Sequence, residues 1–268
     1  MRTRIKKILR SVYSLSTLFG IDPFKAGRTL KGLPAFLRDW QTLKRQEATA
    51  NTKFPSGRFF PCLEERFSEN GTAKGHYFHQ DLLVARRVFL NNPDKHIDIG
   101  SRVDGFIAHV AAFRSIEVVD IRPLSNTVTN ICFLQADLMS TIDAKFHDYC
   151  DSLSCLHALE HFGLGRYGDP VHYDGYLLGL DNLWKMLKKG GKLYFSVPIG
   201  PQRIEFNAHR VFAVSFLLER FAGKYSLDQF SFVDDKGNLH ENIAITDSAA
   251  ANNFNCEYGC GIFEMTKV

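Results

Sequence analysis

The stretch HIDIGSRVDG, residues 96–105, has the pattern of a short buried strand followed by a loop. Its glycines, Gly100 and Gly105, allow the backbone to turn tightly and to approach a ligand more closely than a Cβ atom would permit. Asp98 lies at the end of the strand, where its carboxylate can accept a hydrogen bond from a ligand ammonium group. Two glycines five residues apart do not identify a site, so the interpretation depends on the neighbouring segments.

Outward from this stretch, short apolar strands alternate with helical segments. A helix is expected from Gln80 to the Asn-Asn-Pro sequence at residues 91–93. The expected strands are 96–99, 115–120, 132–136, 149–156 and 192–198. This alternation indicates an α/β, Rossmann-like fold with a doubly wound, mostly parallel sheet and helices on both faces.

Residues 174–191 show the clearest helical periodicity in the chain. Leu177, Leu180 and Leu183 fall on one stripe, and lysines follow near the expected C-terminal end, where cations suit the helix dipole. Glycine often provides the left-handed residue that ends a helix. We therefore expect Gly190 and Gly191 to end this one.

Two further acidic residues follow strands in the same way as Asp98. Asp120 ends the second expected strand, at the spacing where a carboxylate meets the two hydroxyls of a ribose. Asp137 follows the third strand, where it can accept a hydrogen bond from the adenine amino group. Each of the three could instead cap a helix, but their repetition at strand ends favours a nucleoside site.

Two longer segments carry a family resemblance. The runs DSLSCLHALEH (151–161) and LKKGGKLYFSVP (187–198) resemble the fourth and fifth motif regions of class I S-adenosylmethionine-dependent methyltransferases, and the resemblance extends over about residues 94–215. Within that superfamily, HIDIGSRVDGF (96–106) and FNAHRVF (206–212) are similar to a bacterial group of unknown function. The resemblance implies a methyltransferase fold and S-adenosylmethionine as cofactor.

The resemblance also implies roles for individual residues. The methionine part of the cofactor would contact the loop after the first strand, the ribose the end of the second, the adenine the end of the third, and His157 would lie near the methyl group. The implied cofactor residues are Asp98, Gly100, Ser101, Gly105, Asp120, Ile121, Asp137, Leu138 and His157. One departure is that Arg102 and Asp104 occupy loop positions where these enzymes commonly have glycine.

Methyl transfer to a hydroxyl requires a base, and histidine titrates in the useful range. His161 and His209 are the first candidates because both are expected on loops after strands, and His157 is the third. Each could equally be a packing or capping residue.

The acceptor side is expected in the loop 163–170, where Arg166 and Tyr167 are substrate candidates together with Arg203 and Asn207. The acceptor suggested by the family context is a small molecule or a saccharide, such as a surface-polymer precursor hydroxyl. The loop could equally be a structural Ω-loop.

Three other functions fit parts of the sequence. His157, Glu160 and His161 match the H-x-x-E-H pattern of some zinc peptidases, but they follow a buried strand, so we expect no metal. Asp120 would also suit NAD, although the glycine spacing leaves less room for a pyrophosphate. The third alternative is a scaffold that has the fold without catalysis.

The N-terminal part differs in charge from the rest. Residues 1–50 contain 11 basic and 3 acidic side chains, and the remainder is net acidic. Residues 2–18 have the pattern of a basic amphipathic helix, which either binds an anionic membrane or docks on the protein. Residues 20–75 suggest short helices joined by loops. We expect an extension, 1–75, and a methyltransferase domain, 76–268.

Composition limits the cellular setting and the partners. The six cysteines include no paired CxxC sets, which favours a reduced, cytoplasmic protein. The longest apolar stretch falls well short of the ~20 residues that span a bilayer, so we expect no more than peripheral membrane contact. Cys256 and Cys260 could form a metal or redox pair, or simply pack. Nucleic acid is not expected as a partner because the basic residues are confined to the N-terminus.

Overall fold

The structure is a computed structural model that describes residues 12–13, 15–52, 54 and 57–268. The chain forms two compact units, Met1–Thr72 and Ala73–Val268, each packed mainly against itself.

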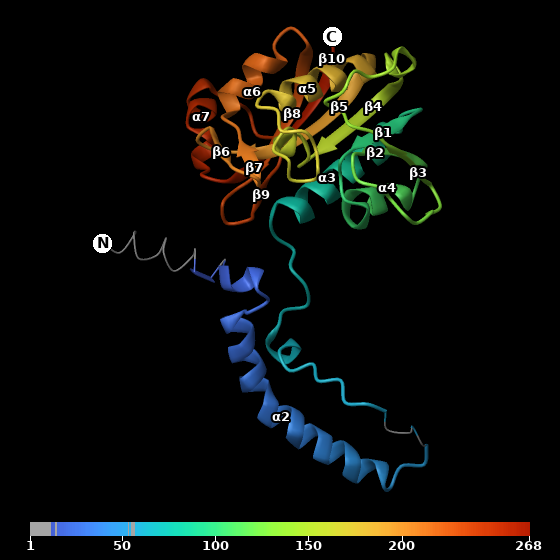
Figure 1. Ribbon diagram of the computed structural model, residues 1–268, viewed down its shortest axis with the longest axis vertical. Coiled ribbons are helices and arrows are strands. Elements are labelled where there is room, and N and C mark those ends of the chain that lie inside the picture. Colours follow the sequence, from blue (N-terminus) through green and yellow to red (C-terminus); the bar gives the residue numbers. More distant parts are fainter. Residues whose placement is uncertain (1–11, 14, 53, 55–56) are drawn as a thin grey trace, which may run out of the picture. The chain divides into compact units, whose positions relative to one another are not determined.

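The main element of the first unit is one long helix, α2 (Pro23–Glu47), and a short 3-10 helix, η1 (Glu65–Phe67), follows it (Figure 1). Asp22 caps α2, because its carboxylate accepts hydrogen bonds from two backbone N–H groups of the first turn. The prediction of several short helices between residues 20 and 75 is therefore wrong.

Two residues that often break helices lie inside α2. Pro34 removes one backbone donor, but splitting the helix there would leave the end groups of two more termini without partners. Gly32 is the one buried residue of α2, and a Cβ atom at this position would overlap the carbonyl group of Leu63. The glycine therefore permits close packing and does not mark a loop.

The predicted basic helix at residues 2–18 lies largely outside the described residues, since 1–11 and 14 are not described. Residues 12–13 and 15–18 are helical. Among the helices that the structure describes, none is both long and apolar enough to cross a membrane. Contact of this segment with a membrane surface stays a prediction.

The second unit is built on an eight-stranded sheet. Its strands are β1 (His96–Ile99), β2 (Ile116–Asp120), β3 (Ile131–Gln135), β4 (Cys150–Leu156), β5 (Leu187–Ile199), β8 (Tyr225–Val233), β9 (Leu239–His240) and β10 (Gly259–Lys267). The order across the sheet is β3-β2-β1-β4-β5-β10-β8-β9 (Figure 1). The first five of these strands pair in parallel, whereas β10 is antiparallel to β5 and β8, and β9 is antiparallel to β8.

A separate hairpin, β6 (Arg203–Glu205) and β7 (His209–Val211), follows β5. The mostly parallel sheet is confirmed, and the first four strands begin and end within one residue of their predicted positions. The strands beyond β5 were not predicted.

Helices cover both faces of this sheet, as expected. The helical elements are α3 (His76–Asn91), η2 (Val103–Ile107), α4 (Ala108–Ala111), η3 (Ala144–Phe146), η4 (Leu159–His161), α5 (Gly175–Met186), α6 (Val214–Phe221), α7 (Asp247–Ala251) and η5 (Asn253–Asn255). One core contains apolar side chains of α3, η2 and α4, and the other contains those of α5, α6 and α7.

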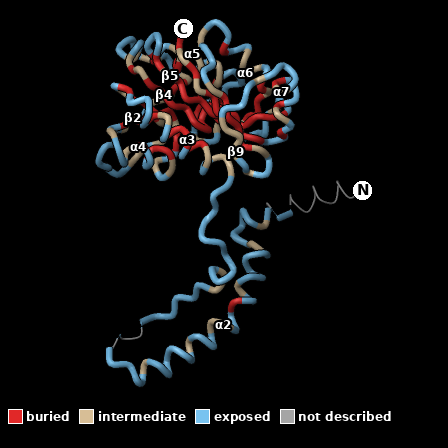
Figure 2. Tube along the Cα trace, turned by 180° about the vertical axis from the view of Figure 1, so that it is seen from behind, coloured by how far each residue is buried: buried red, intermediate tan, exposed pale blue. Residues whose placement is uncertain are grey.

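The strands contribute to both cores because successive side chains point to opposite faces of a sheet. Val118 and Val119 of β2, for example, belong to different cores. Figure 2 shows the buried residues of this unit gathered along the central strands.

Helix α5 ends earlier than its periodicity predicts. Leu187, which was expected within the helix, begins β5 instead. It is fully buried and pairs with Cys150 of β4, so the backbone is already extended before the two glycines. Gly190, with φ of 77°, lies within the irregular first part of this strand. Tertiary pairing overrides the local helical pattern here.

The strand order places a crevice at the middle of the sheet. From β1 the chain continues outward through β2 and β3, whereas β4 and β5 lie on the opposite side of β1. At such a switch point the loops after neighbouring strands diverge and leave space beyond the carboxyl ends. The candidate site is therefore expected beyond the ends of β1, β2, β3 and β4.

Candidate functional site

A cavity occupies this position beyond the strand ends. Its lining includes residues that follow each of the four strands, together with Tyr77 of α3. The lining residues are Tyr77, Ile99, Gly100, Ser101, Arg102, Val119, Asp120, Ile121, Arg122, Ala136, Asp137, Leu138, Met139, Leu156, His157, Ala158, His161, Phe162, Arg166, Tyr167 and Asp169. Most of the predicted cofactor residues are thus brought together.

Asp98 is an exception, and its predicted contact with a ligand is corrected by the structure. The residue is fully buried and does not line the cavity. Its carboxylate accepts hydrogen bonds from the backbone N–H and the hydroxyl of Ser101, at 2.9 Å each, and from the hydroxyl of Ser154 at 2.5 Å. Burial raises the pKa of Asp98 to about 7 against the opposing effect of these bonds. Asp98 therefore shapes the loop that contacts a ligand.

The two glycines of the loop differ in role. Gly100 lines the cavity with φ of 77°, a conformation that L-residues rarely adopt. An added Cβ atom would lie 2.7 Å from that of Ala158, so this glycine brings the loops after β1 and β4 together. Gly105 does not line this cavity, because it faces Asp81 of α3, whose Oδ2 would lie 2.7 Å from an added Cβ. Gly105 therefore lies outside the cavity in which its contact with the cofactor was predicted.

Arg102 and Asp104, the two departures from the usual glycines, form an exposed pair. The Arg102 guanidinium donates to both carboxylate oxygens of Asp104, at 2.9 and 2.6 Å. The following backbone is irregular, since Gly105 interrupts η2 with φ of −122° and ψ of −117°. A regular helix start, which commonly binds phosphate, does not follow this loop.

Asp120 ends β2, as predicted, and it lines the cavity, but it already has a cationic partner. Arg122 donates to it through its backbone N–H at 2.8 Å and through two guanidinium nitrogens at 3.0 and 2.5 Å. The guanidinium also lies 4.4 Å from the ring centre of Tyr167. A ribose would compete with Arg122 for this carboxylate.

Asp137 and Leu138 follow β3 and form part of the cavity wall, and their contact with an adenine stays a prediction. The carboxylate of Asp137 also accepts a hydrogen bond from the backbone N–H of Met139 at 2.8 Å, so it stabilises its own turn. Asn182 of α5 donates to the carbonyl of Leu138 at 2.8 Å and fastens the turn to the helix. Asp137 can therefore line the cavity and also cap its own turn.

His157 follows β4 in a left-handed conformation, with φ of 50°. Its Nδ1 lies 2.7 Å from Oε1 of the buried Glu160, and because a carboxylate accepts, Nδ1 donates. Burial opposes a charge on the ring, but Cys260 and Glu160 outweigh it and raise the pKa of His157 to about 10. A protonated histidine is a poor general base.

His161 is better suited to remove a proton. It lines the cavity, and its Nδ1 donates to the carbonyl of Ala208 at 2.6 Å, which leaves Nε2 with the lone pair. Burial lowers the pKa of His161 despite the nearby charge of Glu160. The ring is therefore neutral near pH 7. His157 precedes the three-residue helix η4, so the two histidines are not one turn apart on a regular helix as the zinc-peptidase pattern requires.

The loop 163–170 reaches the cavity with two of its predicted substrate residues, Arg166 and Tyr167. Asp169 organises it by accepting hydrogen bonds from the backbone N–H groups of Gly163, Gly165 and Tyr167. The Arg166 guanidinium donates to the carbonyl of Ala208 at 3.0 Å.

Three predicted residues do not reach the cavity. His209 packs against Tyr258 with ring centres 5.0 Å apart. Arg203 bonds to Glu205 and to two backbone carbonyls, and Asn207 is exposed in the β6–β7 turn. None of the three is among the residues that line the cavity, although His209 lies close enough to Glu160, His161 and Arg166 for their charges to affect it.

A family model described as a Caenorhabditis protein of unknown function, DUF268, matches residues 110–255, more than half of the chain. The chain belongs to the DUF268 family. This span of the DUF268 chain contains Asp120, Asp137, His157 and His161 and begins after the loop 96–105. The expected closeness to a bacterial group stays a prediction, because the description names Caenorhabditis. No curated protein matches the chain.

Solved structures that are similar to the DUF268 chain include two methyltransferases and a cyclase. The 1,6-didemethyltoxoflavin-N1-methyltransferase of Burkholderia thailandensis, with bound 1,6-didemethyltoxoflavin and S-adenosylhomocysteine, is 14% identical over 73% of this chain and 79% of that chain, with a TM-score of 0.50. The N-methyltransferase NodS of Bradyrhizobium japonicum WM9, in complex with S-adenosylhomocysteine, is 13% identical over 72% and 88%, with a TM-score of 0.47. The [4+2]-cyclase SpnF is 14% identical over 70% and 80%, with a TM-score of 0.49. The predicted Rossmann-like, class I methyltransferase fold is confirmed.

Sequence reasoning missed several residues of this site in the DUF268 chain. Arg122 was overlooked, although its position two residues after Asp120 was a usable signal. Tyr77, at the start of α3, and Phe162 were also missed. Nothing in the local pattern marks Tyr77, because the folding of α3 against the strand ends brings it to the cavity.

Proposed function

We propose that the chain is an S-adenosylmethionine-dependent methyltransferase whose cofactor binds in the cavity beyond β1, β2, β3 and β4. The observation that carries this proposal is the joint lining of one cavity by Gly100, Asp120 and Asp137 at successive strand ends. Gly100 provides close backbone approach, Asp120 two acceptor oxygens for a ribose, and Asp137 an acceptor for the adenine amine.

The charges in the cavity favour this cofactor over a dinucleotide. Two of the cavity arginines, Arg102 and Arg122, are already paired with aspartates, and no regular helix start follows the loop. A pyrophosphate would therefore find few free cationic or N–H partners. S-adenosylmethionine needs none, because it carries no phosphate.

For the reaction, the bound cofactor supplies an electrophilic methyl group, and the protein's part is to align the acceptor and remove its proton. His161 is the base candidate, with Nε2 available and the groups Glu160, His157, Arg166, Tyr167 and His209 around it. Because its pKa is below the ordinary 6.5, base function is present at neutral pH and is lost as the pH falls through this lowered pKa.

For the acceptor, we propose a hydroxyl of a saccharide or related small molecule. Tyr77, Tyr167 and Arg166 line the cavity and would supply aromatic contacts and a hydrogen-bond donor to such an acceptor. Burial raises the pKa of Tyr77 to about 12, so its phenol remains a donor.

The decisive experiment is parallel calorimetric titration with S-adenosylhomocysteine, NAD and NADP. We expect binding of S-adenosylhomocysteine alone, weakened about 10-fold or more by Asp120→Asn, because one lost hydrogen bond to a charged group is worth roughly 1.5–3 kcal/mol. Arg122→Ala tests whether the Asp120–Arg122 ion pair or the carboxylate itself is needed. It removes the cation but retains the Asp120 carboxylate, so we expect it to retain binding.

The exposed Asp143→Asn serves as the matched control and should bind normally. Binding of a dinucleotide only, or of none of the three compounds, would contradict the proposed cofactor. The base is tested with methyl-labelled S-adenosylmethionine and a panel of oligosaccharides. His161→Gln should abolish label transfer while leaving S-adenosylhomocysteine binding unchanged.

A further inference from the structure

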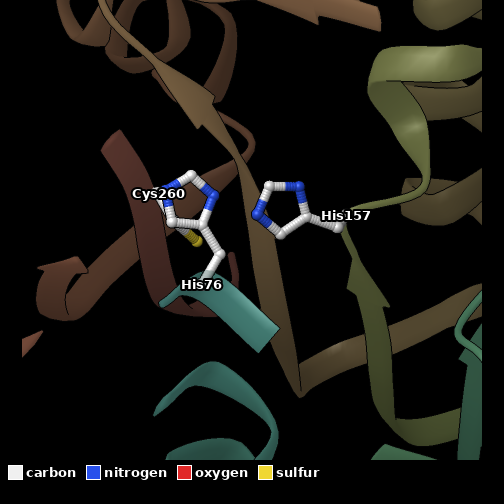
Figure 3. Close-up of side chains that lie close together, drawn as sticks. All are labelled: His76, His157 and Cys260. Atoms are coloured by element: carbon white, nitrogen blue, oxygen red, sulfur yellow. The ribbon is translucent and has the colours of Figure 1, made fainter. Parts of the chain in front are cut away.

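Three potential metal ligands from distant parts of the sequence meet beside the cavity (Figure 3). His76 is the first residue of α3, His157 follows β4, and Cys260 belongs to β10. One ligand atom from each lies within 4.8 Å of the other two, and no other such group of three is found in the described part of the chain. Only His157 of the three also lines the cavity.

The second observation is a buried nitrogen without a partner. Nε2 of His157 is inaccessible to solvent and has no hydrogen-bond partner, although buried polar atoms nearly always have one. Because Nδ1 donates to Glu160, Nε2 is the nitrogen that would lose its proton to a metal, since metal binding requires a deprotonated ligand atom. In Figure 3 a ring nitrogen of His157 faces the ring of His76, and the sulfur of Cys260 is drawn beside the His76 ring.

The surroundings of His157 match those of a metal-binding histidine. Such residues usually donate the other ring N–H to a carboxylate or carbonyl, which sets the tautomer and the ring orientation. Glu160 has this position at 2.7 Å and is itself fully buried. The ring of His76 packs against the ring of Tyr258, with centres 5.3 Å apart.

Charge provides a third argument. The carboxylate of Glu160 is buried, and its Oε2 has no hydrogen-bond partner. A divalent cation with one thiolate and two neutral imidazoles carries a net charge of +1, which the carboxylate balances. Buried charges are tolerated when they are paired or coordinate a metal.

From these observations we infer that His76, His157 and Cys260 form a zinc-binding site that joins α3, the loop after β4 and β10. Imidazole and thiolate together suit Zn²⁺, whereas Ca²⁺ and Mg²⁺ require oxygen ligands. Three protein ligands leave one of the four tetrahedral positions for water. The site is distinct from the H-x-x-E-H reading, because His161 donates to a carbonyl and belongs to the cavity.

Ligation requires a small inward movement of the side chains. Zinc lies about 2.0–2.1 Å from nitrogen and about 2.3 Å from sulfur, which places tetrahedral ligand atoms roughly 3.3–3.6 Å apart. The atoms here are up to 4.8 Å apart. Besides this approach, the rings would have to turn, because those of His76 and His157 are stacked, 11° from parallel with centres 5.1 Å apart. A bound metal would fix the ring of His157 in the cavity wall.

The test uses the full-length protein, stripped with a chelator and titrated with Co²⁺ as a spectroscopic substitute for Zn²⁺. We expect one equivalent to bind, with the visible bands of tetrahedral Co²⁺ and a thiolate-to-cobalt charge-transfer band. Cys260→Ser should remove the charge-transfer band. His76→Gln and His157→Gln should each weaken Zn²⁺ binding at least 10-fold in competition with a chromogenic chelator.

Cys256→Ser is the matched control, since Cys256 is also buried and lies close in sequence but outside the cluster. It should leave the Co²⁺ spectrum unchanged. Absence of stoichiometric binding, or a charge-transfer band that persists in Cys260→Ser, would overturn the site.

A second measurement does not depend on variants that fold poorly. X-ray absorption of the zinc-loaded wild type should show one sulfur and two imidazole nitrogens, and a shell of nitrogen and oxygen alone would overturn the assignment.

Discussion

At the scale of single residues, the loop after β1 depends on a buried carboxyl group. Asp98 accepts its hydrogen bonds from Ser101 and Ser154, and His96 and Asp81 are the other titratable groups nearby. Burial makes the charged form unfavourable and raises the pKa of Asp98 to about 7, against 3.8 for the free side chain. The folded protein therefore binds a proton at Asp98 between about pH 4 and 7 that the unfolded chain releases.

This raised pKa predicts the pH dependence of Asp98→Asn. In the wild type, the stabilising contribution of the protonated carboxyl is fully present below pH 4 and is lost as the pH rises to about 7. Asparagine does not titrate, so the free energy of unfolding of Asp98→Asn relative to the wild type should increase over this range by on the order of 3 kcal/mol. Urea unfolding at a series of pH values measures the difference.

Asp143→Asn provides the control for this prediction. Asp143 is exposed, and a hydrogen bond from the backbone of Lys145 lowers the pKa of its carboxyl group. Its contribution is therefore present above pH 3.8 and is lost below it, which is the opposite sign. A difference between Asp98→Asn and the wild type that does not change from pH 4 to 7 would show that Asp98 titrates normally.

At the scale of elements, the loop after β4 is fastened by one arginine of the neighbouring hairpin. Arg210 of β7 is buried and donates to the carbonyls of Phe162 at 2.6 Å, Tyr173 at 2.8 Å and Glu160 at 3.5 Å. These bonds span both ends of the loop that contains Arg166 and Tyr167. The hairpin β6–β7 thus positions the cavity wall without lining it.

Arg210→Met should release this loop. The substitution retains apolar volume but leaves buried carbonyl groups without donors, so we expect a loss of about 2–4 kcal/mol in unfolding free energy. Faster amide hydrogen exchange at residues 158–174 and weaker S-adenosylhomocysteine binding should accompany it.

The control for this element is Arg203→Met on the partner strand β6. Arg203 is more exposed and bonds to Glu205 and to carbonyls outside the cavity loop. Its replacement should cost about 1 kcal/mol or less and leave exchange at 158–174 unchanged. Equal exchange in both variants would contradict the role of Arg210.

At the scale of the whole molecule, the two units differ in how they are stabilised. Every residue of both hydrophobic cores belongs to Ala73–Val268. In the described part of Met1–Thr72, Gly32 is the sole buried residue. Since apolar burial is the main favourable term in folding, the second unit has what it needs to fold without the first.

We therefore predict that the fragment 73–268 folds cooperatively and binds S-adenosylhomocysteine like the full chain. Its midpoint of thermal unfolding should lie within a few degrees of the second unit's transition in the full chain. Starting at residue 73 and not at the predicted boundary of 76 keeps the hydrogen bond from Gly75 to the carbonyl of Gly237. Calorimetry of both chains measures this, and a fragment without a cooperative transition would refute it.

The amino-acid sequence alone determined the first five strands of the sheet and the acidic residues at their ends. Each strand is a short apolar run, so the alternation with helices could be recognised from local sequence, even for β3, which lies at the sheet edge and has no buried residue. The single helix α2 and the early start of β5 could not be predicted from local sequence. Packing of Gly32 on Leu63 and pairing of Leu187 with Cys150 override local propensity there.

Tertiary structure alone decided which strand-end residues face the cavity. Asp98 and Asp120 look alike in sequence, yet Asp98 is turned inward to Ser101 and Ser154 while Asp120 lines the cavity beside Arg122. The cluster of His76, His157 and Cys260 likewise exists only in the folded chain. The physical reason is that hydrophobic periodicity reports burial within a segment, whereas the direction of a polar side chain depends on partners that long-range packing brings to it.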